Sequence, residues 1–204
     1  MTLTPEVVLH AYASGVFPMS EGRNDPDIFW VDPRERGVIP LNGFHISRSL
    51  ARQMKKGGYI PAINYNFSEV ITACADREDT WINAGIEQVF NELHEAGFAH
   101  SFEIWQNGAL IGGTYGITLG RAFFGESMFS RATGGSKLAL AHLVDHLART
   151  GFTLFDTQFL TPHLASLGGI EISRADYRAR LDEALSGKAD LFSRELAQDP
   201  YCVL

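Results

Sequence analysis

The feature that most limits the fold is a series of strand-like segments joined by two very short turns. The turns are Asn107-Gly108 and Leu119-Gly120, and Asn-Gly between apolar segments is a strong signal for a hairpin. Because turns this short can join only antiparallel neighbours, the sequence predicts a three-stranded antiparallel meander. The strands are predicted over residues 99–106, 109–118 and 121–126.

A strong amphipathic helix and a further strand follow the meander. Residues 136–150 place Leu140, Leu143 and Leu147 on one face of a helix that ends at Gly151. Residues 152–159 are an apolar strand, and shorter helices are predicted before the meander and after this strand. This order favours an α/β (α+β) fold with a mixed, largely antiparallel sheet. We expect a small N-terminal domain over residues 1–43, which includes a strand around Val38-Ile39, and a second domain over residues 44–204.

Composition narrows the class of protein. With 45% hydrophobic residues, a chain of 204 residues can bury a substantial core. No run of 18 apolar residues is present, and the first 12 residues lack the basic and apolar regions of a signal peptide. The two cysteines, Cys74 and Cys202, are too few for a disulfide framework or a zinc site. We therefore expect a cytoplasmic protein with no membrane partner and no metal.

Positive charge is concentrated in one part of an acidic chain. Residues 34–56 hold six cations and one acid, Glu35, which gives this segment a charge of +5. Because the whole chain has a net charge of −7, the remaining residues together carry −12. A cluster of this kind either faces phosphates or forms an ordinary solvated surface. Four cations on one face of a predicted helix, with no acid between them, favour phosphates. These four are Arg48, Arg52, Lys55 and Lys56.

Glu126 is one carboxylate in an otherwise apolar segment, at the end of the third predicted strand. A charge that is buried there is costly unless it meets a cation or several hydrogen-bond donors. Two interpretations remain open from these residues. Either the backbone amides of its own loop satisfy Glu126, or it binds a cationic ligand group such as a free α-amine.

Asp156 and Gln158 lie two residues apart near the end of the last predicted strand. Strand alternation places them on one face, about 7 Å apart. They could be a hydrogen-bonded pair that completes the strand. In a functional site, Asp156 could orient Gln158 or accept a proton from an amine. A neutral amide is a poor base, so Gln158 would position a group instead.

Other residues allow weaker hypotheses. Trp30 and Trp81 lie in loop-like segments beside charged residues, where an indole can stack on a nucleobase or fill a domain junction. His142 and His146 have a spacing that can bind zinc, but a solvated helix face is the better interpretation.

A glycine-containing segment suggests a different enzyme class. The pattern Arg131-x-x-Gly134-x-Ser136 approaches the pyrophosphate loop of coenzyme-A acyltransferases. This segment therefore allows a coenzyme-A-dependent N-acetyltransferase as one interpretation of the chain. A tRNA-binding module without enzymatic activity is another.

Several short motifs, in one order along the chain, resemble the leucyl/phenylalanyl-tRNA–protein transferase family. The resemblance extends from about residue 10 to residue 180. The matching segments are 12–19 (YASGVFPM), 30–34 (WVDPR), 45–50 (HISRSL), 80–82 (TWI), 93–101 (LHEAGFAHS), 112–116 (GGTYG), 125–130 (GESMFS), 156–158 (DTQ) and 163–168 (HLASLG).

The resemblance implies a small N-terminal domain followed by an acyl-CoA N-acyltransferase (GNAT)-like domain. It also implies transfer of Leu or Phe, and also Met, from aminoacyl-tRNA to proteins with an N-terminal Arg or Lys, which marks them for degradation. No cofactor is expected, because the aminoacyl ester of Leu-tRNA or Phe-tRNA is already activated.

The resemblance also assigns roles to residues of this chain. It implies that Glu126 binds the α-amine and that Asp156 and Gln158 take part in catalysis. Trp30 and Trp81 would flank the terminal adenosine and the acceptor, and the four helix cations would bind the tRNA acceptor arm. The aminoacyl side chain would bind at Thr114, Phe123, Leu140, Leu143, Leu147 and Phe155. Some members carry aromatic residues in the segment 140–147, so the preference between Leu and Phe stays open.

Overall fold

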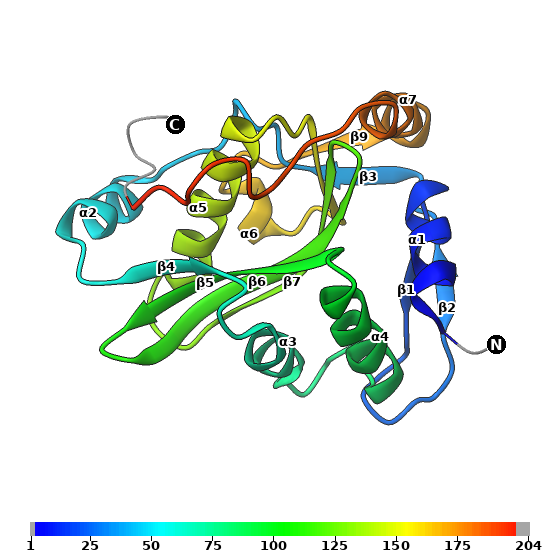
Figure 1. Cartoon of the computed structure of the whole chain (residues 1–204), viewed down its shortest axis with the longest axis horizontal. Helices are drawn as coiled ribbons and strands as arrows, with labels where there is room; N and C mark the ends of the chain where they lie inside the picture. The colour runs from blue at the N-terminus through cyan, green and yellow to red at the C-terminus, as the bar shows by residue number, and fades with distance from the viewer. Residues whose placement is uncertain (1–2, 199–204) are drawn as a thin grey trace.

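A seven-stranded sheet forms the centre of the molecule in the computed structural model, which describes residues 3–198 (Figure 1). Neighbouring strands are antiparallel except β7 and β8, which are parallel. The mixed, largely antiparallel sheet that the sequence predicts is therefore confirmed. In spatial order the strands are β4 (Ile60–Ile63), β5 (Ala99–Gln106), β6 (Ala109–Leu119), β7 (Ala122–Ser130), β8 (Leu154–Gln158), β3 (Glu35–Val38) and β9 (Ile170–Ser173).

The predicted meander is β5, β6 and β7. The first turn is made by Asn107 and Gly108, whose φ angles of 51° and 77° suit a tight hairpin. The third strand is longer than predicted and continues to Ser130, four residues beyond Glu126. Glu126 therefore lies inside a strand and not in a loop.

The strand around Val38 is not part of a small N-terminal unit, which corrects that prediction. It is β3, and it pairs with both β8 and β9 of the large sheet. The N-terminal segment has its own two-stranded sheet, β1 (Phe17–Met19) with β2 (Phe29–Val31), beside helix α1 (Pro5–Ala13). The division of the chain at residue 43 stays a prediction.

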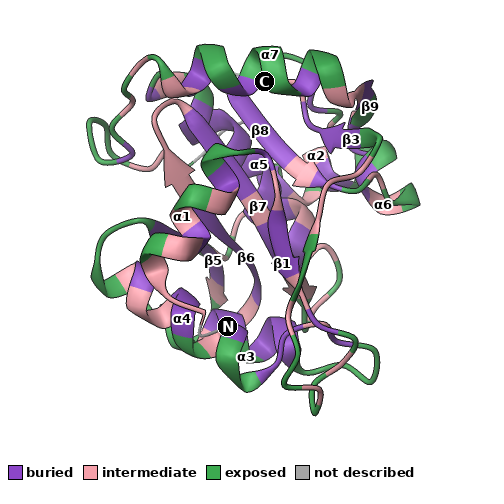
Figure 2. Cartoon of the chain, turned by 90° about the vertical axis from the view of Figure 1, so that its right-hand side faces the viewer, coloured by how far each residue is buried: buried purple, intermediate pink, exposed green. Residues whose placement is uncertain are grey.

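Helices cover both faces of the large sheet (Figure 1). Helices α5 (Gly135–Arg149) and α6 (Pro162–Ala165) lie on one face, and α3 (Phe67–Ala75) and α4 (Ala84–Glu95) lie on the other. Each face has its own hydrophobic cluster. Phe123 and Phe124, adjacent on β7, belong to different clusters, as strand alternation requires. Buried residues accordingly fill the strands between the helical layers (Figure 2).

Four helices begin at a residue whose side chain caps the N-terminus of the helix. Thr4, Ser47, Asn83 and Ser173 each accept a hydrogen bond from a backbone N–H in the first turn of a helix. Ser47 caps helix α2 (Arg48–Lys56), and Ser173 caps helix α7 (Arg174–Leu185). Among residues 3–198, no helix is long and apolar enough to cross a membrane.

His142 and His146 are buried, so the predicted solvated face is wrong. His142 Nδ1 lies 3.1 Å from the carbonyl oxygen of Ala197, and His146 Nε2 lies 2.6 Å from that of Leu191. Both histidines therefore bind the segment after α7, which crosses α5 in Figure 1. Within the described part of the chain, no group of three His, Cys, Asp or Glu side chains could hold a metal ion.

Candidate active site

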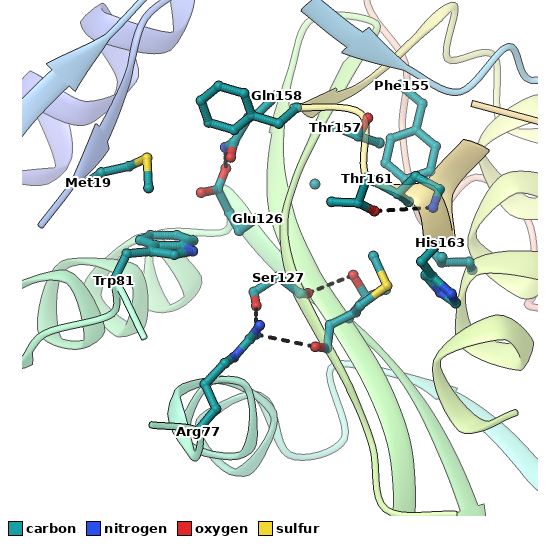
Figure 3. Close-up of a pocket in the computed structure, with 16 residues that line it drawn as sticks. Met19, Arg77, Trp81, Glu126, Ser127, Phe155, Thr157, Gln158, Thr161 and His163 are labelled. Carbon is teal, nitrogen blue, oxygen red and sulfur yellow. Dashed lines mark hydrogen bonds between the residues drawn. The ribbon is translucent and has the colours of Figure 1, made fainter. Parts of the chain in front are cut away.

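A cavity of about 280 Å³ lies where the meander meets the end of β8 (Figure 3). Its wall also includes residues of α5, of α6 and of the segment before α4. Six of the residues that the sequence proposes for the site line this cavity. They are Trp81, Thr114, Glu126, Leu140, Phe155 and Gln158.

The carboxyl group of Glu126 is buried and held from two sides. Its Oε1 accepts hydrogen bonds from Tyr12 Oη at 2.6 Å and from Gln158 Nε2 at 2.9 Å. Its Oε2 is buried and has no hydrogen-bond partner among the described residues. The backbone amides of its own segment do not satisfy Glu126, so one oxygen is left for a ligand.

Burial raises the pKa of Glu126 to about 8, although the hydrogen bonds from Tyr12 and Gln158 act to lower it. A buried carboxyl group with one unpartnered oxygen can accept a hydrogen bond from a primary amine. The site is thus suited to a primary amine and not to an anion.

Gln158 reaches Glu126 from a strained turn. Its φ is 65°, and the N–H of Phe159 donates to the carbonyl of Thr157 at 2.7 Å. This geometry is a γ-turn with a left-handed central residue, which is rare for a residue other than glycine. The turn interrupts strand alternation. Thr157 and Gln158 both line the cavity, whereas Asp156, which simple alternation places on the same face as Gln158, does not line it.

Asp156 lies behind the cavity wall, fully buried, and accepts four hydrogen bonds. Arg36 donates from Nε to Oδ1 at 2.9 Å and from Nη2 to Oδ2 at 2.6 Å. Tyr177 Oη donates to Oδ2 at 2.7 Å, and the backbone N–H of Gln158 donates to Oδ1 at 2.8 Å. Asp156 therefore holds the turn at Gln158 in place and is not itself among the residues that line the cavity.

Arg36 is a structural partner of Asp156 and does not belong to a phosphate-facing patch, which corrects the charge analysis. Its guanidinium lies between the rings of Phe17 and Tyr177, at 4.6 and 4.4 Å from their centroids. Burial lowers the pKa of Arg36, but Asp156 outweighs that effect and the net shift is upward. Arg36 therefore remains charged, and the pair is a buried, fully hydrogen-bonded ion pair.

One wall of the cavity is apolar. Leu140 and Phe155 line it directly, and the hydroxyl of Thr114 donates to the carbonyl of Ser127 at 2.9 Å. The other predicted pocket residues, Phe123, Leu143 and Leu147, are fully buried in the cluster behind this wall and do not line the cavity. They can shape the cavity only through the residues in front of them.

The two tryptophans have different environments. Trp81 lines the cavity beside Glu126, with Met19 facing it (Figure 3). Trp30 is 37% exposed and is not among the lining residues. In the small sheet, Trp30 pairs with Pro18 and Phe29 pairs with Met19. Because paired residues share a face, Trp30 points to the face opposite to Met19.

The structure adds lining residues that the sequence analysis did not propose, chiefly Met19, Arg77 and His163. Met19 and His163 lie in segments that carry the family resemblance, and Arg77 lies three residues before such a segment, so the resemblance is the signal that could have suggested this region. Arg77 Nη2 donates to Ser127 Oγ at 2.6 Å and so fixes the rim of the cavity next to β7.

The four cations of α2 are exposed, and none forms an ion pair with another described residue. The opposite face of the helix packs through Leu50 and Met54, which are buried. Gln53 Nε2 donates to the carbonyl of Thr133 at 2.9 Å. This bond ties α2 to the segment that leads into α5, the helix that carries Leu140.

In the segment that resembles a pyrophosphate loop, backbone N–H groups donate hydrogen bonds to other atoms of the protein. The N–H groups of Arg131 and Ala132 both donate to the carbonyl of Ile111, and the N–H of Ser136 donates to Ser130 Oγ. A Cβ at Gly134 would lie 2.2 Å from Gln53 Oε1. Close packing against β6 and α2 therefore explains this segment without a bound coenzyme.

Comparisons with known proteins give matches to one protein family over nearly the whole chain. The model of the family "Leucyl/phenylalanyl-tRNA protein transferase" matches residues 38–182, and that of its N-terminal domain matches residues 1–34. A leucyl/phenylalanyl-tRNA–protein transferase of Ruegeria pomeroyi is 61% identical over 204 residues, which cover 100% of this chain and 97% of that protein. A transferase of the same name from Cereibacter sphaeroides is 59% identical over 202 residues, 99% of this chain and 94% of that one.

Likeness to solved structures is weaker. The structure of L-PGS from Bacillus licheniformis aligns with a TM-score of 0.43 at 14% identity, over 74% of this chain and 51% of that one. The family matches extend over nearly the full length at high identity and do not depend on that alignment. The chain belongs to the leucyl/phenylalanyl-tRNA–protein transferase family.

Proposed function

We propose that this protein transfers Leu or Phe, and also Met, from aminoacyl-tRNA to the N-terminal Arg or Lys of acceptor proteins in the cytoplasm, and so marks them for degradation. The observation that carries the proposal is the environment of Glu126. Glu126 lines a cavity with an apolar wall, and one of its oxygens is held by Tyr12 and Gln158, while the other has no hydrogen-bond partner among the described residues. An amine next to an aliphatic or aromatic side chain is the common feature of these amino acids.

The chemistry needs no energy source beyond the ester itself. Glu126 holds the α-amine of the aminoacyl group, and Leu140 and Phe155 contact its side chain. The amine of the acceptor attacks the ester carbonyl, so that a C–N bond forms, the C–O3′ bond breaks, and one proton of the amine ends on the 3′-oxygen of the tRNA. Holding amine and ester in contact can supply much of the rate enhancement.

The roles of Gln158 and Asp156 follow from their contacts. Gln158 lines the cavity and orients Glu126, so it can also hydrogen-bond the reacting groups. Asp156 acts through Gln158, because all its described contacts are to Arg36, Tyr177 and the Gln158 backbone. We therefore propose Gln158 as a catalytic residue and Asp156 as a positioning residue.

The cations of α2 are the proposed contact for the tRNA acceptor arm. Their unpaired charges face solvent on a helix that Gln53 joins to the start of α5. Trp81, next to Glu126 in the cavity, is the better of the two tryptophans for contact with the terminal adenosine. Trp30 could contact tRNA only outside the cavity.

The deciding experiment measures transfer of radiolabelled Leu from leucyl-tRNA to two peptides that differ only in an N-terminal Arg or Asp. Transfer to the Arg peptide alone is expected. Acetyl transfer from acetyl-coenzyme A without Leu transfer would instead support the N-acetyltransferase alternative, which the internally bonded loop at residues 131–136 disfavours. Binding of tRNA without any transfer would support the binding-module alternative.

A further inference from the structure

Lys137, in the first turn of α5, is a cation whose charge no other described residue balances. It is partly exposed, and its ammonium forms no ion pair with a carboxylate that the structure describes. Two other cations of this region have partners. Arg131 forms an ion pair with Glu69 at 2.9 Å, and Arg77 donates to Ser127 Oγ at 2.6 Å. Lys137 therefore differs from both, because its charge is left for a ligand.

The helix places Lys137 on the side of α5 that faces the cavity. Residues three apart lie on the same face of a helix, and Lys137 is three residues before Leu140, which lines the cavity. The charge of Lys137 also reaches His163, a lining residue on α6. Burial lowers the pKa of His163, and the nearby ammonium lowers it further. Lys137 is not itself among the lining residues, so we place it at the edge of the cavity.

The segment that leads into α5 also contacts α2. Gln53 of α2 donates to the carbonyl of Thr133 at 2.9 Å, and a Cβ at Gly134 would lie against Gln53. Behind this contact, the buried side of α2 and the buried side of α5 belong to one hydrophobic cluster. The chain thus passes from α2 to the cavity over residues 134–140, and Lys137 is the one cation in that segment.

An aminoacyl-tRNA has a phosphate group to offer at this place. In the proposed function the acceptor arm lies on α2 and the terminal adenosine lies in the cavity, so the single-stranded 3′ end must pass from one to the other. Proteins bind single-stranded nucleic acid with positive charges that follow its backbone, and a lysine ammonium binds phosphate as a compact point charge. The phosphate nearest to the cavity is the one that joins the terminal adenosine to the nucleotide before it.

We infer that Lys137 binds the phosphate between the terminal adenosine of the aminoacyl-tRNA and the preceding nucleotide. This inference rests on the proposed function. The contact extends the line of cations from α2 to the edge of the cavity, and it aligns the 3′ end while Glu126 holds the amine. Lys137 touches no reacting atom, so it is a binding residue and not a catalytic one.

The test uses two unreactive donor analogues that differ by one phosphate and one nucleoside. The first is adenosine that carries leucine through a 3′-amide, and the second is the same compound with a cytidylate joined to its 5′-oxygen. Each is measured as an inhibitor of Leu transfer from leucyl-tRNA to the Arg peptide. Lys137→Gln should raise the Ki of the second analogue by about three- to tenfold and leave the Ki of the first within twofold of wild type. Lys137→Arg keeps the charge and should restore the Ki.

A matched control is Lys188→Gln, which removes an exposed cation next to the β6–β7 turn, at the other end of β7 from Lys137. It should equal wild type with both analogues, and circular dichroism checks that each variant is folded. With leucyl-tRNA, Lys137→Gln should also make the slope of log kcat/KM against log salt shallower by about 0.7.

Two results would overturn the phosphate contact and leave the proposed function intact. One is a Ki within twofold of wild type for both analogues with Lys137→Gln, and the other is an equal loss for both, which would indicate a disturbed cavity. Failure of the wild type to transfer Leu from leucyl-tRNA would overturn the proposed function itself.

Discussion

The side-chain amide of Gln158 donates a hydrogen bond to the carboxyl group of Glu126 over 2.9 Å. The two residues lie on β8 and β7, the parallel pair of the sheet. Tyr12 of α1 donates to the same oxygen from another direction. The orientation of the Glu126 carboxyl is thus fixed before an amine arrives, which lowers the ordering cost of binding.

Replacing Glu126 by Gln should weaken the binding of aminoacyl-tRNA more than the binding of uncharged tRNA. The amide cannot pair with an α-ammonium, and a hydrogen bond to a charged group contributes about 1.5–3 kcal/mol. Binding of leucyl-tRNA should weaken by about tenfold or more, while uncharged tRNA should bind within twofold of wild type. Filter-binding or fluorescence titration with both tRNAs checks this. Equal losses for both would contradict an amine contact at Glu126.

The raised pKa of Glu126 predicts a pH-dependent stability difference between Glu126→Gln and wild type. The folded carboxyl binds its proton up to about pH 8, whereas the unfolded carboxyl releases it near pH 4.3. Wild-type stability therefore falls between those pH values. The variant lacks this loss, so it should gain on wild type by about 4 kcal/mol from pH 5 to pH 8.5. Thermal unfolding at both pH values measures the difference, and a constant offset would speak against a protonated Glu126.

Asp156→Asn should unfold more easily as well as lose transfer activity. The change leaves the charge of Arg36 buried without its partner, which costs about 3–5 kcal/mol. Tyr177→Phe removes one hydrogen bond to the same carboxylate and should cost about 1–2 kcal/mol. Chemical denaturation of the three proteins gives the comparison. If Asp156→Asn abolished transfer at unchanged stability, direct proton transfer by Asp156 would be favoured over positioning.

Reversing charge on α2 should weaken tRNA binding in a salt-dependent way. In Arg48→Glu/Arg52→Glu, two phosphate contacts are lost, so the slope of log K against log salt should become shallower by about two. A matched control is Arg180→Glu/Lys188→Glu, which reverses two exposed cations away from α2. The control should keep the wild-type slope. Identical titrations for both double variants would exclude α2 as the tRNA contact.

Local patterns were enough to predict much of the fold. The meander, the helix after it and four N-terminal caps were predictable, because turn residues and capping side chains act over three or four positions. The strands β1 and β9 were not predicted, since segments of three and four residues have too little periodicity to distinguish them from turns.

The supports of the site could not be predicted because they depend on distant contacts. Arg36 and Asp156 are 120 residues apart, and nothing in the charge pattern distinguishes Arg36 from the solvated cations near it. Gln158 has a positive φ that its residue type does not suggest. The histidines of α5 have polar character but bind a segment about 50 residues later. Family resemblance pointed to the right region, while the functional roles of its residues stay predictions.

The hydrogen bond from Tyr12 to Glu126 joins positions 114 residues apart, and Tyr177 of α7 secures Asp156 from near the opposite end of the chain. During synthesis, residue 12 leaves the ribosome early and residue 177 leaves late. A chain that has been synthesised only as far as residue 176 consequently lacks one of the four hydrogen bonds that hold Asp156. The support behind the Gln158 turn is therefore complete only late in translation.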